Sequence, residues 1–186
     1  MTCLSHVSFS YGSQTILKDF TYEFHPGECY TLMGASGIGK TTLIRLLAGL
    51  EKPDSGSICI DTPVSVKFQE PRLCPWLTTA GNIELVTHKG SPLVGRWLQA
   101  VRLEDRAEHY PDELSGGMQQ RAALARALAY MEYADCPLVL LDEPFNGLDA
   151  DLHDEMRCLV LDAVKGRTLI LVSHDPSDAC GQLIHL

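Results

Sequence analysis

The chain has 186 residues, a length that suits one domain with a full hydrophobic core. Its composition, with 45% hydrophobic and 21% charged residues, excludes collagen-like, low-complexity and largely disordered chains. The formal net charge of -9 has the wrong sign for a protein that mainly neutralises nucleic-acid phosphates or anionic lipids. We therefore expect no nucleic-acid partner.

The cysteines and the amino terminus predict where the chain works. The seven cysteines are scattered and form no C-x-x-C pair, which favours reduced thiols in a cytosolic protein over a zinc or redox site. Residues 1–6 lack the charged and apolar regions of a signal peptide. The most apolar stretch, residues 41–50, is interrupted by Arg45 and is shorter than the ~18 residues of a membrane span. We expect a cytoplasmic chain that does not itself cross a membrane.

The first third of the chain predicts strands around one helix. Alternating apolar residues predict antiparallel strands between residues 4 and 24, joined by a turn at Gly12-Ser13. A short buried strand is expected at 29–33, and it leads into a glycine-rich loop. A helix is expected at 41–48, with Gly49 as its stop. Further short strands are expected at 57–60 and 64–68.

The rest of the chain alternates helices and strands. We expect a mostly helical region at 78–108 with a break at 90–92, and then helices at 114–131 and 149–165. Strands are expected at 138–141, 168–172 and 182–186, with a short helix before the last. This alternation predicts an α/β fold whose mostly parallel sheet is flanked by helices, with an antiparallel piece in front of it and a helical insertion. No linker is visible, so residues 1–186 are expected to form a single domain, with the insertion at about 70–114.

The strongest motif is GASGIGKT at Gly34–Thr41, a match to G-x-x-x-x-G-K-[ST] between a predicted strand and a predicted helix. Glycines let successive N–H groups point at phosphate oxygens, and the helix N-terminus adds partial positive charge. Lys40 would reach the β- and γ-phosphates, and the Thr41 hydroxyl would bind Mg²⁺. The alternative is a plain glycine-rich turn. The expected nucleotide-binding residues are Gly34, Ala35, Ser36, Gly37, Ile38, Gly39, Lys40, Thr41 and Thr42.

Two carboxylates follow the apolar run at 138–141. In P-loop nucleotide hydrolases an Asp at this strand end holds Mg²⁺, usually through water, and a Glu one residue later can orient the attacking water. Asp142 is thus the expected metal ligand and Glu143 the expected general base. The alternative is that the two acids only solvate a strand end.

The run LSGGMQQR at 114–121 closely resembles the LSGGQxQR signature of ATP-binding cassette (ABC) ATPases. It places a hydroxyl and two glycines at a helix start, which is a phosphate-binding geometry. Ser115, Gly116 and Gly117 are therefore expected to contact nucleotide. Met118 replaces the usual glutamine, and we expect an altered rate rather than lost function. The resemblance covers essentially the whole chain and implies a P-loop NTPase fold of RecA-like type, with an N-terminal antiparallel β subdomain.

Four further residues match ABC elements in the expected order. The resemblance implies that Tyr11 stacks on adenine and that Gln69 completes the Mg²⁺ and water shell. Asp149 lies in the D-loop match Asn146–Asp149, and His174 matches the switch histidine that holds the γ-phosphate. Without the resemblance, these would be a core aromatic, a strand-end glutamine, an ordinary acid and an inert histidine.

The resemblance also implies partners. In ABC proteins the P-loop of one subunit and the signature of another enclose ATP, so we expect a nucleotide-dependent dimer. Separate transmembrane permease subunits would dock on the segment 70–77, where Leu73, Trp76 and Leu77 are unusually apolar for a loop. Alternatively, Trp76 anchors the insertion in its own core. The run 68–78 looks like that of nitrate, sulfonate and taurine importer ATPases, which implies a solute-binding protein in the system and a position at the cytoplasmic membrane face.

Two other functions stay open. A soluble ABC ATPase outside transport would normally carry two cassettes or a long coiled-coil insertion, and neither is visible. A subunit that senses nucleotide without turnover is also compatible with the motifs. A P-loop kinase or GTPase is disfavoured, because those enzymes have no use for the LSGG run or for His174, and the chain has no N-K-x-D element.

Overall fold

The computed structural model describes all 186 residues, which form two compact units. The first unit consists of residues 1–66, 137–142 and 166–186. The second consists of residues 67–136 and 143–165, so the segment 70–114 expected as an insertion forms part of it.

The first unit begins with an antiparallel sheet. Strands β1 (Thr2–Tyr11) and β2 (Gln14–Phe24) pair antiparallel across the turn at Gly12-Ser13, as predicted. The third strand, β4 (Ser55–Cys59), pairs with the other edge of β1. It begins two residues earlier than predicted and ends one residue earlier, because its limits follow pairing with β1 rather than its own weak apolar pattern.

A five-stranded sheet with the order β5-β6-β7-β3-β8 forms the core of the first unit. Strand β7 pairs parallel with both β6 and β3, and β8 pairs parallel with β3, which confirms the predicted parallel sheet. Every residue of β6 and β7 is buried, as continuous apolar runs indicate. A 3-10 turn precedes β8 in place of the short helix. The strands are β3 (Cys29–Met33), β5 (Val64–Lys67), β6 (Leu138–Asp142), β7 (Thr168–Val172) and β8 (Gln182–His185), and the turn is η3 (Pro176–Asp178).

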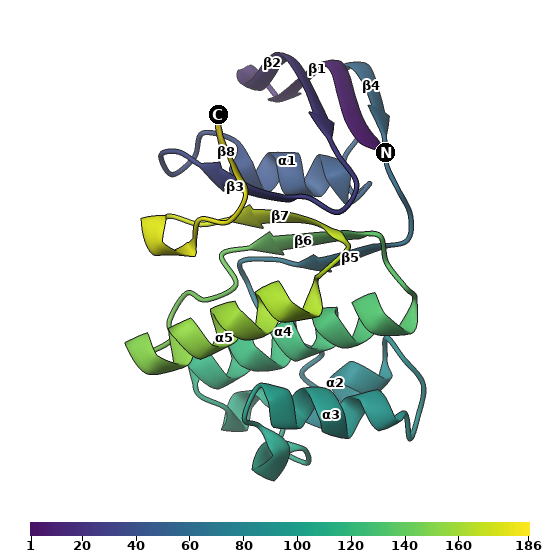
Figure 1. Ribbon diagram of the computed structural model, residues 1–186, viewed down its shortest axis with the longest axis vertical. Helices are drawn as coiled ribbons and strands as arrows, with labels where there is room; N and C mark the ends of the chain where they lie inside the picture. Colours follow the sequence, from purple (N-terminus) through teal and green to yellow (C-terminus); the bar gives the residue numbers. More distant parts are fainter. The chain divides into compact units, whose positions relative to one another are not determined.

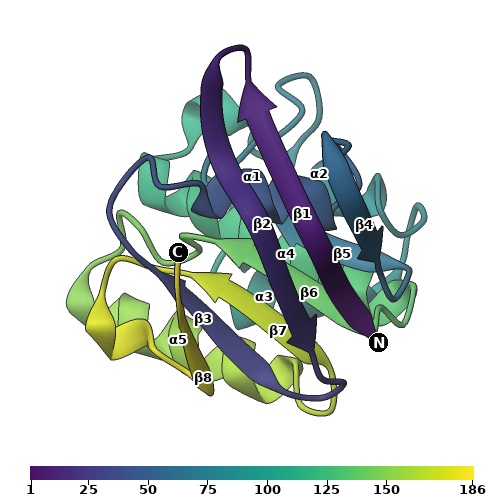
Figure 2. The same cartoon turned by 90° about the horizontal axis from the view of Figure 1, so that it is seen from above.

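Helix α1 (Lys40–Leu47) lies between the two sheets of the first unit (Figure 1). Seen from above, the antiparallel sheet covers it (Figure 2). Leu43, Ile44 and Leu47 are completely buried, so the helix is apolar on more than one side. Gly49 follows with φ 70°, and its N–H bonds to the carbonyl of Leu46, which confirms the predicted stop.

The second unit is helical. The break near residue 90 confirms the sequence prediction, and α2 and α3 both pack on the long helix α4. Helix α4 begins at Gly116 rather than at Leu114, because Ser115 has extended backbone angles and caps the helix. No helix of the structure combines the length and apolar character that crossing a bilayer demands. The elements are α2 (Thr79–Glu84), α3 (Pro92–Ala100), α4 (Gly116–Tyr133), α5 (Ala150–Ala163), η1 (Glu104–Arg106) and η2 (Pro111–Glu113).

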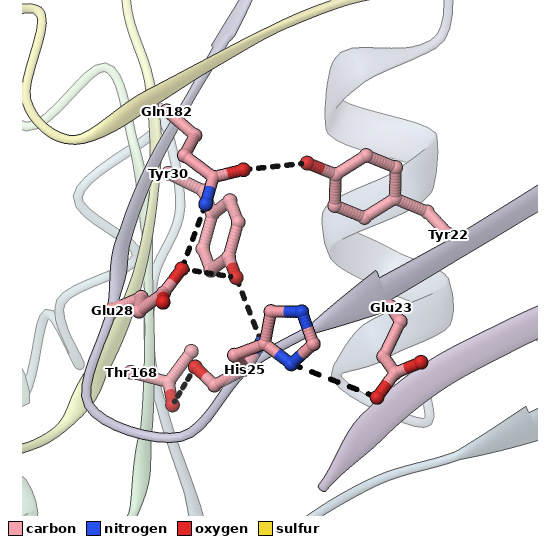
Figure 3. A network of polar contacts seen from close by, with 7 residues as sticks. All are labelled: Tyr22, Glu23, His25, Glu28, Tyr30, Thr168 and Gln182. Atoms are coloured by element: carbon pink, nitrogen blue, oxygen red, sulfur yellow. Dashed lines mark hydrogen bonds and ion pairs between the residues drawn. The ribbon is translucent and has the colours of Figure 1, made fainter.

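A polar network around the buried Tyr30 joins β2, β3 and β8 in the first unit (Figure 3). The Tyr30 side chain is completely buried, and its hydroxyl donates to Glu28 Oε2 at 3.0 Å while accepting from the His25 N–H at 2.7 Å. Gln182 Nε2 donates to the same Glu28 oxygen at 2.8 Å, and the Tyr22 hydroxyl donates to Gln182 Oε1 at 3.4 Å. The network therefore satisfies the Tyr30 hydroxyl, which would otherwise be costly to bury.

Replacing Tyr30 by Phe is expected to lower the free energy of unfolding by about 1–3 kcal/mol, because the His25 N–H loses its acceptor and Glu28 loses a donor. Urea denaturation measures this loss. Tyr22→Phe is the control, since its longer bond lies at a half-buried position and should contribute less. Equal losses in the two variants would contradict the assignment of Tyr30 as the centre of the network.

The same tyrosine predicts how stability depends on pH. Burial, mainly, and the neighbouring Glu28 carboxylate raise the pKa of Tyr30 above its ordinary 10.0. Above that pH the unfolded chain loses this proton more readily than the folded one, so the stabilisation present below pH 10.0 is lost as the pH rises. The Tyr30→Phe variant should lose less stability between neutral and strongly alkaline pH than the wild type, as measured by urea denaturation at each pH.

Candidate functional site

Three strands of the first unit, β3, β6 and β7, end at the same edge of the parallel sheet, and each carries a predicted site residue or loop at or just after its end. Asp142, the last residue of β6, lies opposite Val172, the last residue of β7, and His174 follows two residues later. On the other side of β7, β3 ends at Met33 and the glycine-rich loop begins. Ligands bind at the carboxyl ends of strands in open α/β sheets, because loops and helix N-termini converge there. The predicted phosphate loop, metal ligand and switch histidine of this unit therefore all lie at or just after strands that end at the same edge of the sheet.

The loop Gly34–Gly39 takes a shape that needs glycine. Gly34, Gly37 and Gly39 have φ values of 149°, 80° and 118°, a region that other residues rarely adopt. A Cβ on Gly39 would also lie 2.7 Å from Ile16 Cγ2. The residues between, Ala35 to Ile38, are exposed, so the part of the loop that would face phosphate is open to ligand.

Lys40 is held inside this loop. Its side chain is only 5% exposed, and its ammonium donates to the carbonyls of Gly34 and Ala35 at 2.7 and 2.9 Å. The cation therefore lies against the start of the same loop whose N–H groups could bind an anion. This is the position from which it can neutralise phosphate oxygens.

The two predicted metal ligands of this unit are in contact. The Thr41 hydroxyl donates to Asp142 Oδ2 at 2.8 Å, and Asp142 is almost completely buried. Adjacent ligands of an octahedral Mg²⁺ with bonds of about 2.0–2.1 Å lie about 2.9 Å apart, so these two oxygens fit one ion. No cluster of three His, Cys, Asp or Glu side chains exists, so waters and phosphates would complete the shell, as Mg²⁺ prefers.

Tyr11 and His174, the other predicted site residues of the first unit, are exposed. The Tyr11 ring is 47% exposed at the end of β1, and it packs edge-on against Phe9 with ring centres 4.9 Å apart. This supports a stacking surface rather than the alternative of a core aromatic. His174 follows Ser173, whose buried hydroxyl donates to Asp178 and accepts from the Asp175 N–H, so the backbone on both sides of the histidine is fixed.

The second unit holds Glu143 by its carboxylate. Gln69 Nε2 donates to Glu143 Oε2 at 3.0 Å, and Asn146 Nδ2 donates to the same oxygen at 3.3 Å. The carbonyl of Gln69 in turn accepts from Gln120 Nε2 at 3.0 Å. The predicted base Glu143 and Gln69, the predicted member of the Mg²⁺ and water shell, are therefore direct partners. Asn146 belongs to the D-loop match, and its contact with Glu143 could not be predicted from the sequence.

The signature and D-loop residues also lie together in the second unit. Ser115 caps α4 by accepting from the Met118 N–H, and Asp149 caps α5 by accepting from the Leu152 N–H. A Cβ on Gly117 would lie 3.1 Å from the Gly147 carbonyl, so the two loops are in close contact. Both Ser115 and Gly116 are exposed, which leaves the helix start accessible.

Three polar side chains for which sequence reasoning predicted no role organise the second unit: the buried Arg121 and Asn82, and the half-buried Arg126. Arg121 donates to the carbonyls of Val101 and Arg102 at 2.6 and 2.8 Å, and thus ties α4 to the end of α3. Arg126 donates to the carbonyls of Pro71 and Arg72, and the completely buried Asn82 donates to three carbonyls of the loop that precedes it, those of residues 74, 77 and 78. No local pattern distinguishes Arg126 or Asn82 from surface polar residues of a helix, and Arg121 is marked only as the last residue of the signature match.

These contacts determine the environment of Trp76. The loop that carries it is anchored by Arg126 and Asn82, yet the Trp76 side chain is 73% exposed. The tryptophan of the local core is instead Trp97, which is 3% exposed and donates to Glu132 at 3.1 Å. The alternative that Trp76 anchors the insertion in its own core is therefore wrong, and of the three apolar residues of this loop Trp76 is exposed while Leu73 and Leu77 are half-buried.

Comparisons with known proteins agree with this geometry. A family model described as ABC transporter matches residues 17–146. The aliphatic sulfonates import ATP-binding protein SsuB 1 of Shouchella clausii is 39% identical over 181 residues, which are 95% of this chain and 72% of the relative. The corresponding SsuB of Granulibacter bethesdensis is 43% identical over 181 residues, 95% of this chain and 74% of the relative. SsuB 2 of Burkholderia cenocepacia is 41% identical over 182 residues, which cover 91% of this chain and 66% of the relative.

Solved structures show the same fold. The ATP-binding cassette MJ0796, in a dimeric post-hydrolysis state bound to ADP and Pi, matches with a TM-score of 0.88 at 30% identity. The match covers 100% of this chain and 94% of the MJ0796 chain. An ATP-binding subunit of an ABC transporter has a TM-score of 0.87 at 26% identity, with coverages of 100% and 85%. The resemblance inferred from the motifs is thus confirmed, and the chain belongs to the ABC transporter family as an ATP-binding, ATP-hydrolysing cassette.

Proposed function

We propose that the chain binds MgATP and hydrolyses it to ADP and phosphate in order to drive import through separate membrane subunits. The observation that carries this proposal is the meeting of the Gly34–Thr41 loop with Asp142 at one sheet edge, including the 2.8 Å bond from Thr41 to Asp142. Two of the predicted magnesium ligands are thereby preorganised beside the phosphate loop.

Each predicted site residue has its own role in the proposed reaction. The phosphates are bound by Lys40, by Thr42 and by the backbone N–H groups of residues 34–41, and Tyr11 stacks on the adenine. Thr41 and Asp142, with Gln69, hold Mg²⁺, which when bound neutralises charge on the phosphates. Glu143 accepts the proton of the attacking water, while His174 contacts the γ-phosphate. The exposed position of His174 after β7 supports its access to ligand.

The proposed active unit contains two cassettes. Ser115, Gly116 and Gly117 of one chain, with Asp149 of its D-loop, complete the nucleotide site of another, which the exposed start of α4 supports. The similar cassette MJ0796 is described as dimeric with ADP and Pi. Loss of the γ-phosphate removes the contact shared by the two chains and favours the open form of the dimer, so hydrolysis drives a conformational change.

The proposed partners are transmembrane permease subunits at the cytoplasmic membrane face and a solute-binding protein outside. The chain is about 40% identical to several proteins named as aliphatic sulfonate importers, which supports import of an organic sulfonate. The anchored loop with exposed Trp76 supports docking of the permease there. We retain residues 1–186 as a single cassette domain in which about 70–114 form the inserted helical subdomain.

The Glu143→Gln variant is expected to bind ATP normally, to release phosphate at least about 100-fold more slowly, and to accumulate as an ATP-bound dimer, because the amide cannot accept the water proton. Phosphate release and size-exclusion chromatography with ATP measure the two effects. Glu104→Gln, at an exposed position of the same unit, is the matched control and should behave as wild type. Normal turnover of Glu143→Gln would rule out Glu143 as the base.

The Trp76→Ser variant is expected to reduce copurification of the cassette with its permease about tenfold, because an exposed aromatic anchor is lost from the docking loop. Its melting temperature should stay within a few degrees of wild type, since the side chain contributes little to the core. Leu85→Ser, another exposed apolar residue of the second unit, is the control. Undiminished copurification of Trp76→Ser would place the docking surface elsewhere.

A further inference from the structure

Lys67 is a buried charge that the proposed mechanism does not use. It is the last residue of β5 and the first residue of the second unit, and only 2% of it is exposed. Lysine is rarely buried to this degree, because removing an ammonium from water is costly unless partners compensate. Its position therefore calls for a specific contact.

One contact of the Lys67 ammonium is with the main chain of the proposed base. Lys67 Nζ donates to the carbonyl oxygen of Glu143 at 3.0 Å. Glu143 has φ 46°, a left-handed backbone conformation that residues other than glycine adopt infrequently. A hydrogen bond from a charged donor is stronger than one from a neutral donor, so it can hold a carbonyl in a conformation that the residue would otherwise leave.

The same segment also holds the side chain of Glu143. Gln69, two residues after Lys67, donates to Glu143 Oε2 at 3.0 Å, and Asn146 donates to that oxygen at 3.3 Å. Gln120 fixes the Gln69 carbonyl at 3.0 Å. Lys67 thus binds the backbone of Glu143, and Gln69 binds its carboxylate. Catalysis needs a base held to within fractions of an ångström, so these two hydrogen bonds are functionally significant.

We propose that Lys67 is a positioning residue for hydrolysis: its buried ammonium holds the Glu143 carbonyl, keeps the backbone left-handed and thereby aims the carboxylate at the attacking water. This inference rests on the proposed role of Glu143 as the base. Lys67 touches neither nucleotide nor water in this role, and its contribution lies entirely in the geometry of Glu143.

The test compares Lys67→Met with Lys67→Arg. Methionine has a similar length and suits a buried site, but it cannot donate to the carbonyl. We expect Lys67→Met to lower kcat about tenfold while KM for ATP and the affinity for ATP stay within about twofold, because only the geometry of the base changes. Lys67→Arg, which keeps a charged donor, should recover part of kcat. Lys165→Met removes the same charge at an exposed position of the second unit and should match wild type.

Double variants separate this inference from the assignment of the base. Once Glu143→Gln has removed the base, adding Lys67→Met should not lower the residual turnover further. If Glu143→Gln is inactive and Lys67→Met keeps wild-type kcat, the positioning role is wrong and the base assignment stands. If Glu143→Gln keeps wild-type turnover, Glu143 is not the base, and the positioning role of Lys67, which rests on that assignment, is wrong as well. A Lys67→Met variant whose only defect is a lowered melting temperature or a raised KM would also overturn the positioning role.

Discussion

The structure depends on the burial of three neighbouring parallel strands: β6 and β7 are buried along their whole length, and β3 at its three central residues. Because their side chains face protein on both sides, a one-residue slip in register would expose or crowd apolar groups, and the register is therefore firmly specified. That register places Asp142 opposite Val172, and the loop after Met33 on the other side of β7. The buried strands thus set where the proposed phosphate and metal site lies, while the glycines of the loop set its conformation.

In the second unit, hydrogen bonds and helix caps position the functional groups, including Glu143, which directly follows the last residue of β6. Helix caps by Ser115 and Asp149 orient the two loops that carry the signature and D-loop residues. Glu143 is held through its carboxylate and its carbonyl by separate partners. Hydrogen bonds here replace the apolar packing that positions Asp142, and each bond depends on a partner that is itself fixed.

Polar side chains connect separate elements throughout the molecule. Tyr30 joins strands of the first unit, Arg121 joins two helices, and Arg126 and Asn82 hold the loop that carries Trp76. Burial lowers the pKa of both arginines, a measure of the desolvation that their carbonyl contacts offset. Such groups are costly when unpaired, so each one specifies a single arrangement of the elements it connects.

Contiguous residues were enough to predict the glycine-rich phosphate loop, the apolar strands and the order of the family motifs, whereas the caps of α4 and α5 came from the structure. Tertiary structure alone decided which of two tryptophans is buried, and that Asn146, Lys67 and Gln69 converge on Glu143. The physical reason is the range of the interaction. Backbone conformation and period depend on near neighbours, whereas a hydrogen bond between residues 76 positions apart exists only once the core has brought them together.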